Sequence, residues 1–253
     1  MHLIPLYLVK AKFWTWPKFG YKLPDKENYT CQSDYILPFT GKWCVWEGGT
    51  TEKLSIDWNE PGDRFVYYFI IIDENGNHFS SNDSSVENNL CYGKDILATA
   101  DGVVVKVSNI HSDCSDSKSD EITDCTGTWN MVGNHIIIQH TKNEYSCVGN
   151  LMRDSVMVKV GDIVKQGDAI ARCGNSGYAT EQPCLYFNVF SSKSFYMSIS
   201  LPVAFTNIRA QNGAAYDLAY ASTRVKRPTT QGNLEVVGNK SYIGRGLDVE
   251  NDI

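Results

Sequence analysis

A doubled Gly-Asp turn constrains the fold of this chain more than any other feature. Residues 160–164 read VGDIV, and residues 166–170 read QGDAI. Glycine is favoured where a turn needs a positive φ, and Asp is a common turn residue. Two such turns so close together leave room only for very short strands that are tightly connected. This region is therefore expected to be compact β-structure.

Other segments also have the character of strands. Residues 65–72, FVYYFIII, form a continuous run of aromatic and β-branched side chains, which is typical of a buried strand. Asn75-Gly76 follows this run as a tight-turn signal. No segment shows convincing helical periodicity over a normal helix length, so the expected class is all-β. Further strands are expected within residues 96–107, 134–139, 144–151 and 184–190.

Composition narrows the function classes. The hydrophobic content of 42% is ordinary for a globular protein. The net charge of −6 argues against nucleic acid or an anionic membrane as a partner, because either would require a basic face. The apolar run at residues 3–9 has no basic region before it and is too short to cross a bilayer. We therefore expect no signal peptide and no integral membrane segment, and the compartment stays open.

The positions of the cysteines in the sequence do not by themselves define a set of disulfides or a zinc site. No two of the eight form a CxxC pair, so a structural zinc knuckle is not expected. An even number allows disulfides without showing them, and the simplest interpretation is free, buried cysteines. Cys114 and Cys125 bracket an acidic segment and are the first pair to test for a bridge.

Several motifs follow one another in a fixed order along the chain. They are ILATADGVVVKV, GNHIIIQH, EYSCVGNL and VKVGDIVKQGDAIARCGNSG, preceded by SDYILPFTGKW, GGTTEKLS and DRFVYYFIIIDENG. In this order they resemble one known family, the lysostaphin-type (LytM-domain) zinc metallopeptidases. The resemblance covers residues 35–210 and implies the duplicated hybrid motif fold, an all-β fold with a β-sandwich or barrel-like core. Residues 1–34 and 211–253 would be irregular extensions, the second packing on or trailing the domain, and the acidic residues 109–128 a surface insertion.

Active members of this family bind zinc through a His and an Asp of an early motif and the last His of an HxH motif. Water fills the fourth position, and zinc lowers its pKa so that hydroxide is available near neutral pH. Two further His, in a YxHL-like segment and at the start of the HxH motif, stabilise charge and transfer protons. The HxH pair lies on one face of a strand because side chains alternate with a period of two.

By this resemblance, all five functional positions are changed in this chain. The three zinc-ligand positions fall at Ile56, Tyr68 and Tyr186, and the two catalytic positions fall at Asn150 and Cys184. Isoleucine has no donor atom, and a phenol is a poor donor at its ordinary pKa of about 10. Asn150 cannot accept a proton, so Cys184 would lack a base. We therefore expect no zinc and no other cofactor.

The resemblance thus predicts a catalytically inactive homologue of a peptidoglycan-type zinc metalloendopeptidase, serving as a binding, scaffolding or regulatory module. Tyr68, Asn150, Cys184 and Tyr186 are expected to line a groove. Its partner would be a peptide or glycopeptide of the cell wall, or another protein. Two alternatives remain: a residual metalloendopeptidase acting on cell-wall peptides through a reorganised zinc site, and a purely structural domain whose groove is closed by the tyrosines.

Overall fold

The structure, a computed structural model, is all-β over the residues that it describes, as the sequence predicted. One 3₁₀ turn, η2 (Val86–Asn88), accompanies the strands. The described residues are 17, 22–81, 85–113, 132–177, 182–194, 198–212, 216–219, 223–226, 235–236 and 238–252. The strands are β1 (Trp43–Glu47), β2 (Tyr67–Ile70), β3 (Asp95–Leu97), β4 (Gly102–Ser108), β5 (His135–Thr141), β6 (Glu144–Gly149), β7 (Ile163–Val164), β8 (Ala169–Arg172), β9 (Leu185–Phe190), β10 (Ile208–Asn212), β11 (Tyr216–Ala219), β12 (Thr223–Lys226), β13 (Glu235–Val236) and β14 (Leu247–Asn251).

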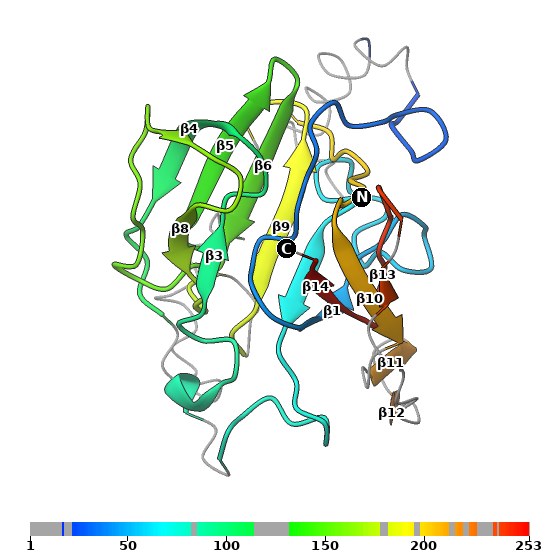
Figure 1. Cartoon of the computed structure of the whole chain (residues 1–253), viewed down its shortest axis with the longest axis vertical. Helices are drawn as coiled ribbons and strands as arrows, with labels where there is room; N and C mark the ends of the chain where they lie inside the picture. Colours follow the sequence, from blue (N-terminus) through cyan, green and yellow to red (C-terminus); the bar gives the residue numbers. More distant parts are fainter. Residues whose placement is uncertain are drawn as a thin grey trace, which may run out of the picture.

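Ten of these strands form one open sheet, which runs across the whole molecule (Figure 1). The strand order is β13-β10-β14-β1-β2-β9-β6-β5-β4-β7, and every neighbouring pair is antiparallel. β2 and β9, which carry most of the residues of interest, lie in the middle of the sheet.

The two Gly-Asp turns fold as the sequence predicted. Gly161 has a φ of 96° and Gly167 a φ of 89°, values that L side chains rarely adopt. Each turn leads into a short strand, first β7 and then β8. β8 pairs with β3 in a separate two-stranded sheet, whose buried side chains belong to the same core as those of β5 and β6.

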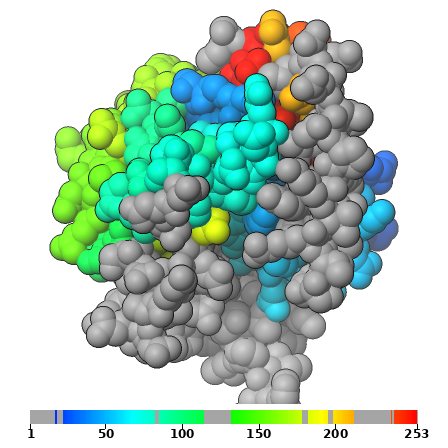
Figure 2. All heavy atoms as spheres, turned by 90° about the horizontal axis from the view of Figure 1, so that it is seen from below, coloured from blue at the N-terminus to red at the C-terminus, as the bar shows by residue number. Residues whose placement is uncertain are grey.

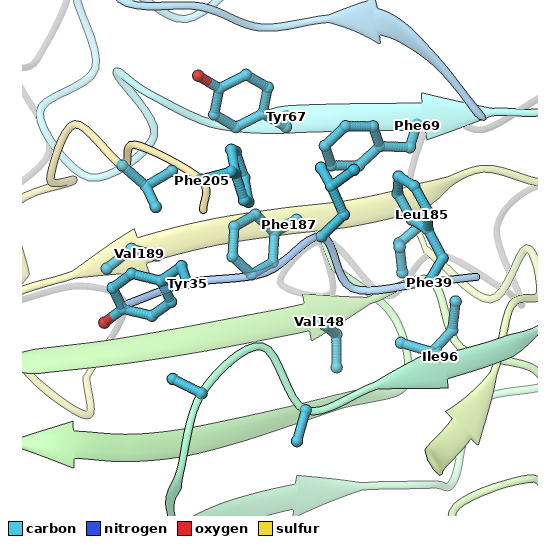
Figure 3. Packing of buried hydrophobic residues seen from close by; sticks show 14 of the residues in the cluster. Tyr35, Phe39, Tyr67, Phe69, Ile96, Val148, Leu185, Phe187, Val189 and Phe205 are labelled. Carbon is cyan, nitrogen blue, oxygen red and sulfur yellow. The ribbon is translucent and has the colours of Figure 1, made fainter. Parts of the chain in front are cut away.

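The main core lies on one face of the large sheet (Figure 3). Tyr67 and Phe69 of β2 point into it together with Phe187 of β9, because alternate residues of a strand share a face. An irregular segment that carries Tyr35 and Phe39 runs over these rings and covers them. The opposite face of β2 and β9 is consequently left for Tyr68, Cys184, Tyr186 and Asn188.

A buried carboxylate fastens the N-terminal segment to the sheet. Glu144, at the start of β6, has no solvent exposure. Its carboxylate accepts hydrogen bonds from the hydroxyl of Tyr29 at 3.0 Å and from the backbone N–H groups of Gln32 at 2.6 Å and Ser33 at 3.0 Å. These bonds hold residues 29–35 against the β5–β6 hairpin.

The C-terminal part of the chain enters the sheet. β14 lies inside residues 211–253, the range expected to be an extension, and it is hydrogen-bonded between β1 and β10. Seen from below, the chain between β2 and β4 spreads over one face of the molecule beside the green residues of β5 to β8 (Figure 2). Most of the expected insertion at 109–128, including Cys114 and Cys125, lies outside the described residues. Over the described part of the chain, no helix is long and apolar enough to cross a membrane.

Candidate functional site

Tyr68 and Tyr186 occupy directly opposed positions of two neighbouring strands. They are a cross-strand pair of β2 and β9, and their rings meet edge to face with centroids 5.7 Å apart. Tyr186 is buried, with 2% of its surface exposed, whereas Tyr68 is partly buried. The pair forms because β2 and β9 are adjacent, although more than a hundred residues separate them in sequence.

Asn150 and Cys184 join this pair from adjoining strand ends. Cys184 immediately precedes β9, on the same side as Tyr186, and packs with Tyr68 in one apolar cluster. Asn150 immediately follows β6, in the left-handed region with a φ of 59°. Its amide Nδ2 donates to the Cys184 Sγ at 3.2 Å. Four of the five predicted positions are therefore close together in space.

The fifth position behaves differently. Ile56 lies in a turn-rich segment, and its side chain is 58% exposed. Neither of the two apolar clusters around Tyr68 and Tyr186 contains it. The residue of this segment that approaches the site is the neighbouring Asp57. Burial and Cys184 are the larger causes of the raised pKa of the Tyr68 phenol, and the charge of Asp57 adds to them.

The structure adds a buried polar network that sequence reasoning missed. The hydroxyl of Tyr186 donates to the Asp63 carboxylate at 2.7 Å, and the Asn188 amide donates to the same oxygen at 3.2 Å. Ser200 then donates its hydroxyl to the Asn188 carbonyl oxygen at 2.8 Å. The one available signal was Asp63 itself, a charged residue two positions before the apolar run at residues 65–72.

Burial dominates the electrostatics of the site. It raises the pKa of both tyrosines well above the ordinary phenol value, and Asp63 adds to this effect at Tyr186. Burial also raises the pKa of the Cys184 thiol to about 12, with Cys91 as the next cause. All three groups are therefore protonated and neutral near neutral pH. Burial raises the pKa of Asp63 as well, while the hydrogen bonds from Tyr186 and Asn188 oppose that shift.

Tyr68, Asn150, Cys184 and Tyr186 are packed together and do not line an open cleft. Asn150 and Cys184 are 1% and 8% exposed, so of the four residues expected to line a groove only Tyr68 is more than marginally accessible. Two surface pockets on the described residues have other linings. One lies around Asp73, His78 and Leu90, and the other around residues 152–157. Within the described ranges, no three His, Cys, Asp or Glu side chains are arranged to hold a metal ion.

The described part of the chain is all-β, and its motifs follow the order found in lysostaphin-type peptidases. Residues 82–196 match the model of Peptidase family M23. The resemblance drawn from the motifs is thereby confirmed. No curated protein matches the sequence.

Several solved structures are similar to this chain. A zinc-containing peptidase from Vibrio cholerae is 18% identical with a TM-score of 0.39, and the match covers 67% of this chain and 39% of that one. The catalytic domain of lysostaphin from Staphylococcus simulans is 18% identical with a TM-score of 0.34, covering 64% and 88%. The SpoIIQ–SpoIIIAH pore-forming complex contains a chain that is 14% identical with a TM-score of 0.41, covering 68% and 89%.

Proposed function

We propose that this chain is a catalytically inactive homologue of a peptidoglycan-type zinc metalloendopeptidase and acts as a binding or scaffolding module. The observation that carries the proposal is the Tyr68–Tyr186 pair, whose rings pack against each other. The hydroxyl of Tyr186 already donates a hydrogen bond to Asp63. By the resemblance, these tyrosines stand where two zinc ligands would be. A side chain that packs and hydrogen-bonds within the protein has no donor directed at a metal.

The side chains at the family positions do not fit zinc. Catalytic zinc sites in proteins use three His, Asp, Glu or Cys donors and keep one position open for water. Ile56 offers no donor, and the phenols of Tyr68 and Tyr186 are kept neutral by burial. Cys184 is a donor of the right type, but its thiol is protonated and already accepts a hydrogen bond from Asn150. We therefore derive no hydrolytic step for this chain.

Tyr68 is the residue of the cluster through which a ligand would be bound. It is partly buried and lies beside the carboxylates of Asp57 and Asp63, both of which influence its pKa. An aromatic ring next to acidic groups suits a peptide or glycopeptide that carries amino groups, because the ring provides apolar contact and the carboxylates provide charge complementarity.

A second candidate function has an observation of its own. Asn150, Cys184 and Tyr186 are almost completely buried, as expected if the site has been closed by packing. On this alternative, the domain is purely structural and the cluster contributes stability in place of binding.

Zinc binding and hydrolysis are tested on the full chain. The protein is incubated with excess zinc, desalted and analysed for metal by mass spectrometry, and then assayed on cross-linked peptidoglycan peptides. We expect far less than one zinc per chain and no cleavage above the rate without protein. Near-stoichiometric zinc accompanied by turnover would overturn the proposal.

Co-sedimentation with insoluble peptidoglycan separates binding from a purely structural role. We expect the wild-type chain to sediment and Tyr68→Ala to weaken this binding at least about tenfold, as for a central aromatic contact. Tyr242→Ala is the matched control, because Tyr242 is 37% exposed and belongs to neither site cluster. Absence of binding by the wild-type chain supports the structural alternative, and equal losses in the two variants would show that Tyr68 is not the contact.

A further inference from the structure

Three buried cysteines gather behind the candidate site. Cys91 and Cys173 have no solvent exposure, and Cys184 is 8% exposed. They come from the segment before β3, the residue after β8 and the residue before β9. Sequence spacing alone could not bring them together, because Cys91 and Cys173 are separated by β3 to β8.

Backbone pairing places Cys91 next to Cys173. β3 and β8 pair with Asp95 opposite Arg172, and the pairing continues one step to Lys94, whose carbonyl accepts from the Cys173 N–H at 2.8 Å. The N–H of Gly93 donates to the Cys173 carbonyl, also at 2.8 Å. A turn closed by the bond from Lys94 N–H to the Cys91 carbonyl, at 3.3 Å, folds Cys91 back towards this strand end.

The side chains complete the arrangement. The Cys91 and Cys173 thiols are both free in this structure, and Cys91 is close enough to Cys173 to raise the pKa of that thiol, after the larger effect of burial. The Cys91 thiol donates to the Asn89 Oδ1 at 3.1 Å. The Cys91 Sγ also lies 3.1 Å from the Pro183 carbonyl oxygen, directly beside the start of β9. The third thiol has a separate partner, because the Asn150 amide donates to Cys184. The backbone pairing therefore favours Cys91 and Cys173 as the pair, while the Cys184 thiol is engaged by Asn150.

We infer that Cys91 and Cys173 are a disulfide site that cross-links the loop before β3 to the end of β8. The oxidant is a low-molecular-weight disulfide. One cysteine thiolate attacks a sulfur of that disulfide, expels one small thiolate and leaves a mixed disulfide. The second cysteine attacks the protein sulfur and releases the other small thiolate. Two protein thiols lose two electrons and two protons, and the small disulfide becomes two thiols.

Burial determines when the bridge forms. It raises the pKa of the Cys173 thiol well above its ordinary value, so little of the reactive thiolate exists in the folded protein. The bridge therefore forms while the chain is folding and, once enclosed, is protected from reduction. The cross-link closes a loop of about 80 residues, and loops of that size give large entropic stabilisation in the chain-entropy model.

The experiment refolds the full chain under controlled redox conditions. The protein is unfolded and reduced, then refolded either in a mixture of reduced and oxidised glutathione or in reductant alone. Free thiols are blocked with N-ethylmaleimide, and the protein is digested without reduction by trypsin and by a protease that cleaves after Glu. Cleavage after Glu181 separates Cys173 from Cys184, and the peptides are analysed by mass spectrometry. We expect the Cys91 peptide to be joined to the Cys173 peptide, while Cys184 is blocked. We also expect the oxidised protein to melt about 10 °C higher than the reduced protein.

Two matched variants show which cysteines form the bridge and cause the difference in melting temperature. Cys184→Ser is expected to keep both the linked peptide and the difference in melting temperature, whereas Cys173→Ser is expected to lose both. The inference is overturned if Cys91 and Cys173 are both blocked in the protein refolded with oxidised glutathione, or if Cys91 is joined to Cys184. The peptide map of the wild-type chain decides this even if a variant does not fold.

Discussion

Asp57 and Asp63 are acidic residues on the turn-rich segment that leads into β2, and the charge of Asp63 affects Asp57. Burial raises the pKa of Asp57, the negative charges of Asp63 and Glu60 add to this effect, and together they bring the pKa to about 6. The ionised form of Asp57 is consequently less favourable in the folded protein than in the unfolded chain. At neutral pH this carboxylate destabilises the fold.

Replacing Asp57 by Asn should remove that penalty. The folded pKa lies above the ordinary value of 3.8, so the penalty is absent below about pH 4, grows as pH rises through about 6 and is complete above that. We expect Asp57→Asn to be more stable than wild type by about 1–2 kcal/mol at pH 7.5 and equal to it at pH 3.5. Urea unfolding at the two pH values measures this, with the exposed Glu74→Gln as control. A gain that is the same at both pH values would contradict the assignment.

The residue scale also shows where sequence reasoning succeeds and where it stops. The period of two correctly puts Cys184 and Tyr186 on one face of β9, because a regular strand transmits that information. Asp63 was missed because a polar side chain in an irregular turn carries no periodic signal. Ile56 was assigned to a ligand position by its distance in sequence from Tyr68, and loops can change such a distance freely. Its side chain is exposed. The assignment of Ile56, Tyr68 and Tyr186 as vacated ligand positions, and of Asn150 and Cys184 as vacated catalytic positions, stays a prediction.

Among the elements, the β5–β6 hairpin depends on a contact from outside the sheet. The carboxylate of Glu144 is buried and accepts hydrogen bonds from two backbone N–H groups and two tyrosine hydroxyls of residues 29–35. A carboxylate can be buried at acceptable cost only when its oxygens are so fully hydrogen-bonded. The N-terminal segment therefore acts as part of the domain.

Glu144→Gln should weaken this attachment strongly. The amide keeps the shape but directs an NH₂ group at donors and removes the charge that strengthens the bonds. We expect a loss of about 2–4 kcal/mol in the free energy of unfolding, measured by urea denaturation. Glu74→Gln, an exposed site, should change stability by less than about 0.5 kcal/mol. Equal stabilities of the two variants would show that the bonds to Glu144 contribute little.

For the molecule as a whole, β14 determines whether the sheet is continuous. It pairs with β1 on one side and β10 on the other, and its Val249 has no exposure. Local pattern predicted most of the individual strands, since each depends on nearby residues. Strand order could not be obtained from composition or periodicity, because pairing of residues 43–44 with residues 248–249 is a contact across almost the entire chain. The domain limits at 34 and 210 remain a prediction.

Two adjacent substitutions test whether β14 is an integral strand. Val249→Asp would place a carboxylate in the main core and is expected to lower the free energy of unfolding by at least about 3 kcal/mol. Glu250→Asp alters the partly buried neighbour and is expected to cost less than about 1 kcal/mol. Thermal unfolding followed by circular dichroism measures both. If β14 only trails the domain, Val249→Asp will melt like wild type.

The order of the large sheet has a consequence for how the molecule behaves among its own copies. An open sheet presents unpaired N–H and C=O groups along its outer strands, and such edges recruit further strands from other molecules. Here the outermost strands are β13 and β7, each only two residues long. So short an edge offers too few hydrogen bonds to hold an incoming strand. A ten-stranded sheet can therefore remain open in a crowded solution without growing into a polymer.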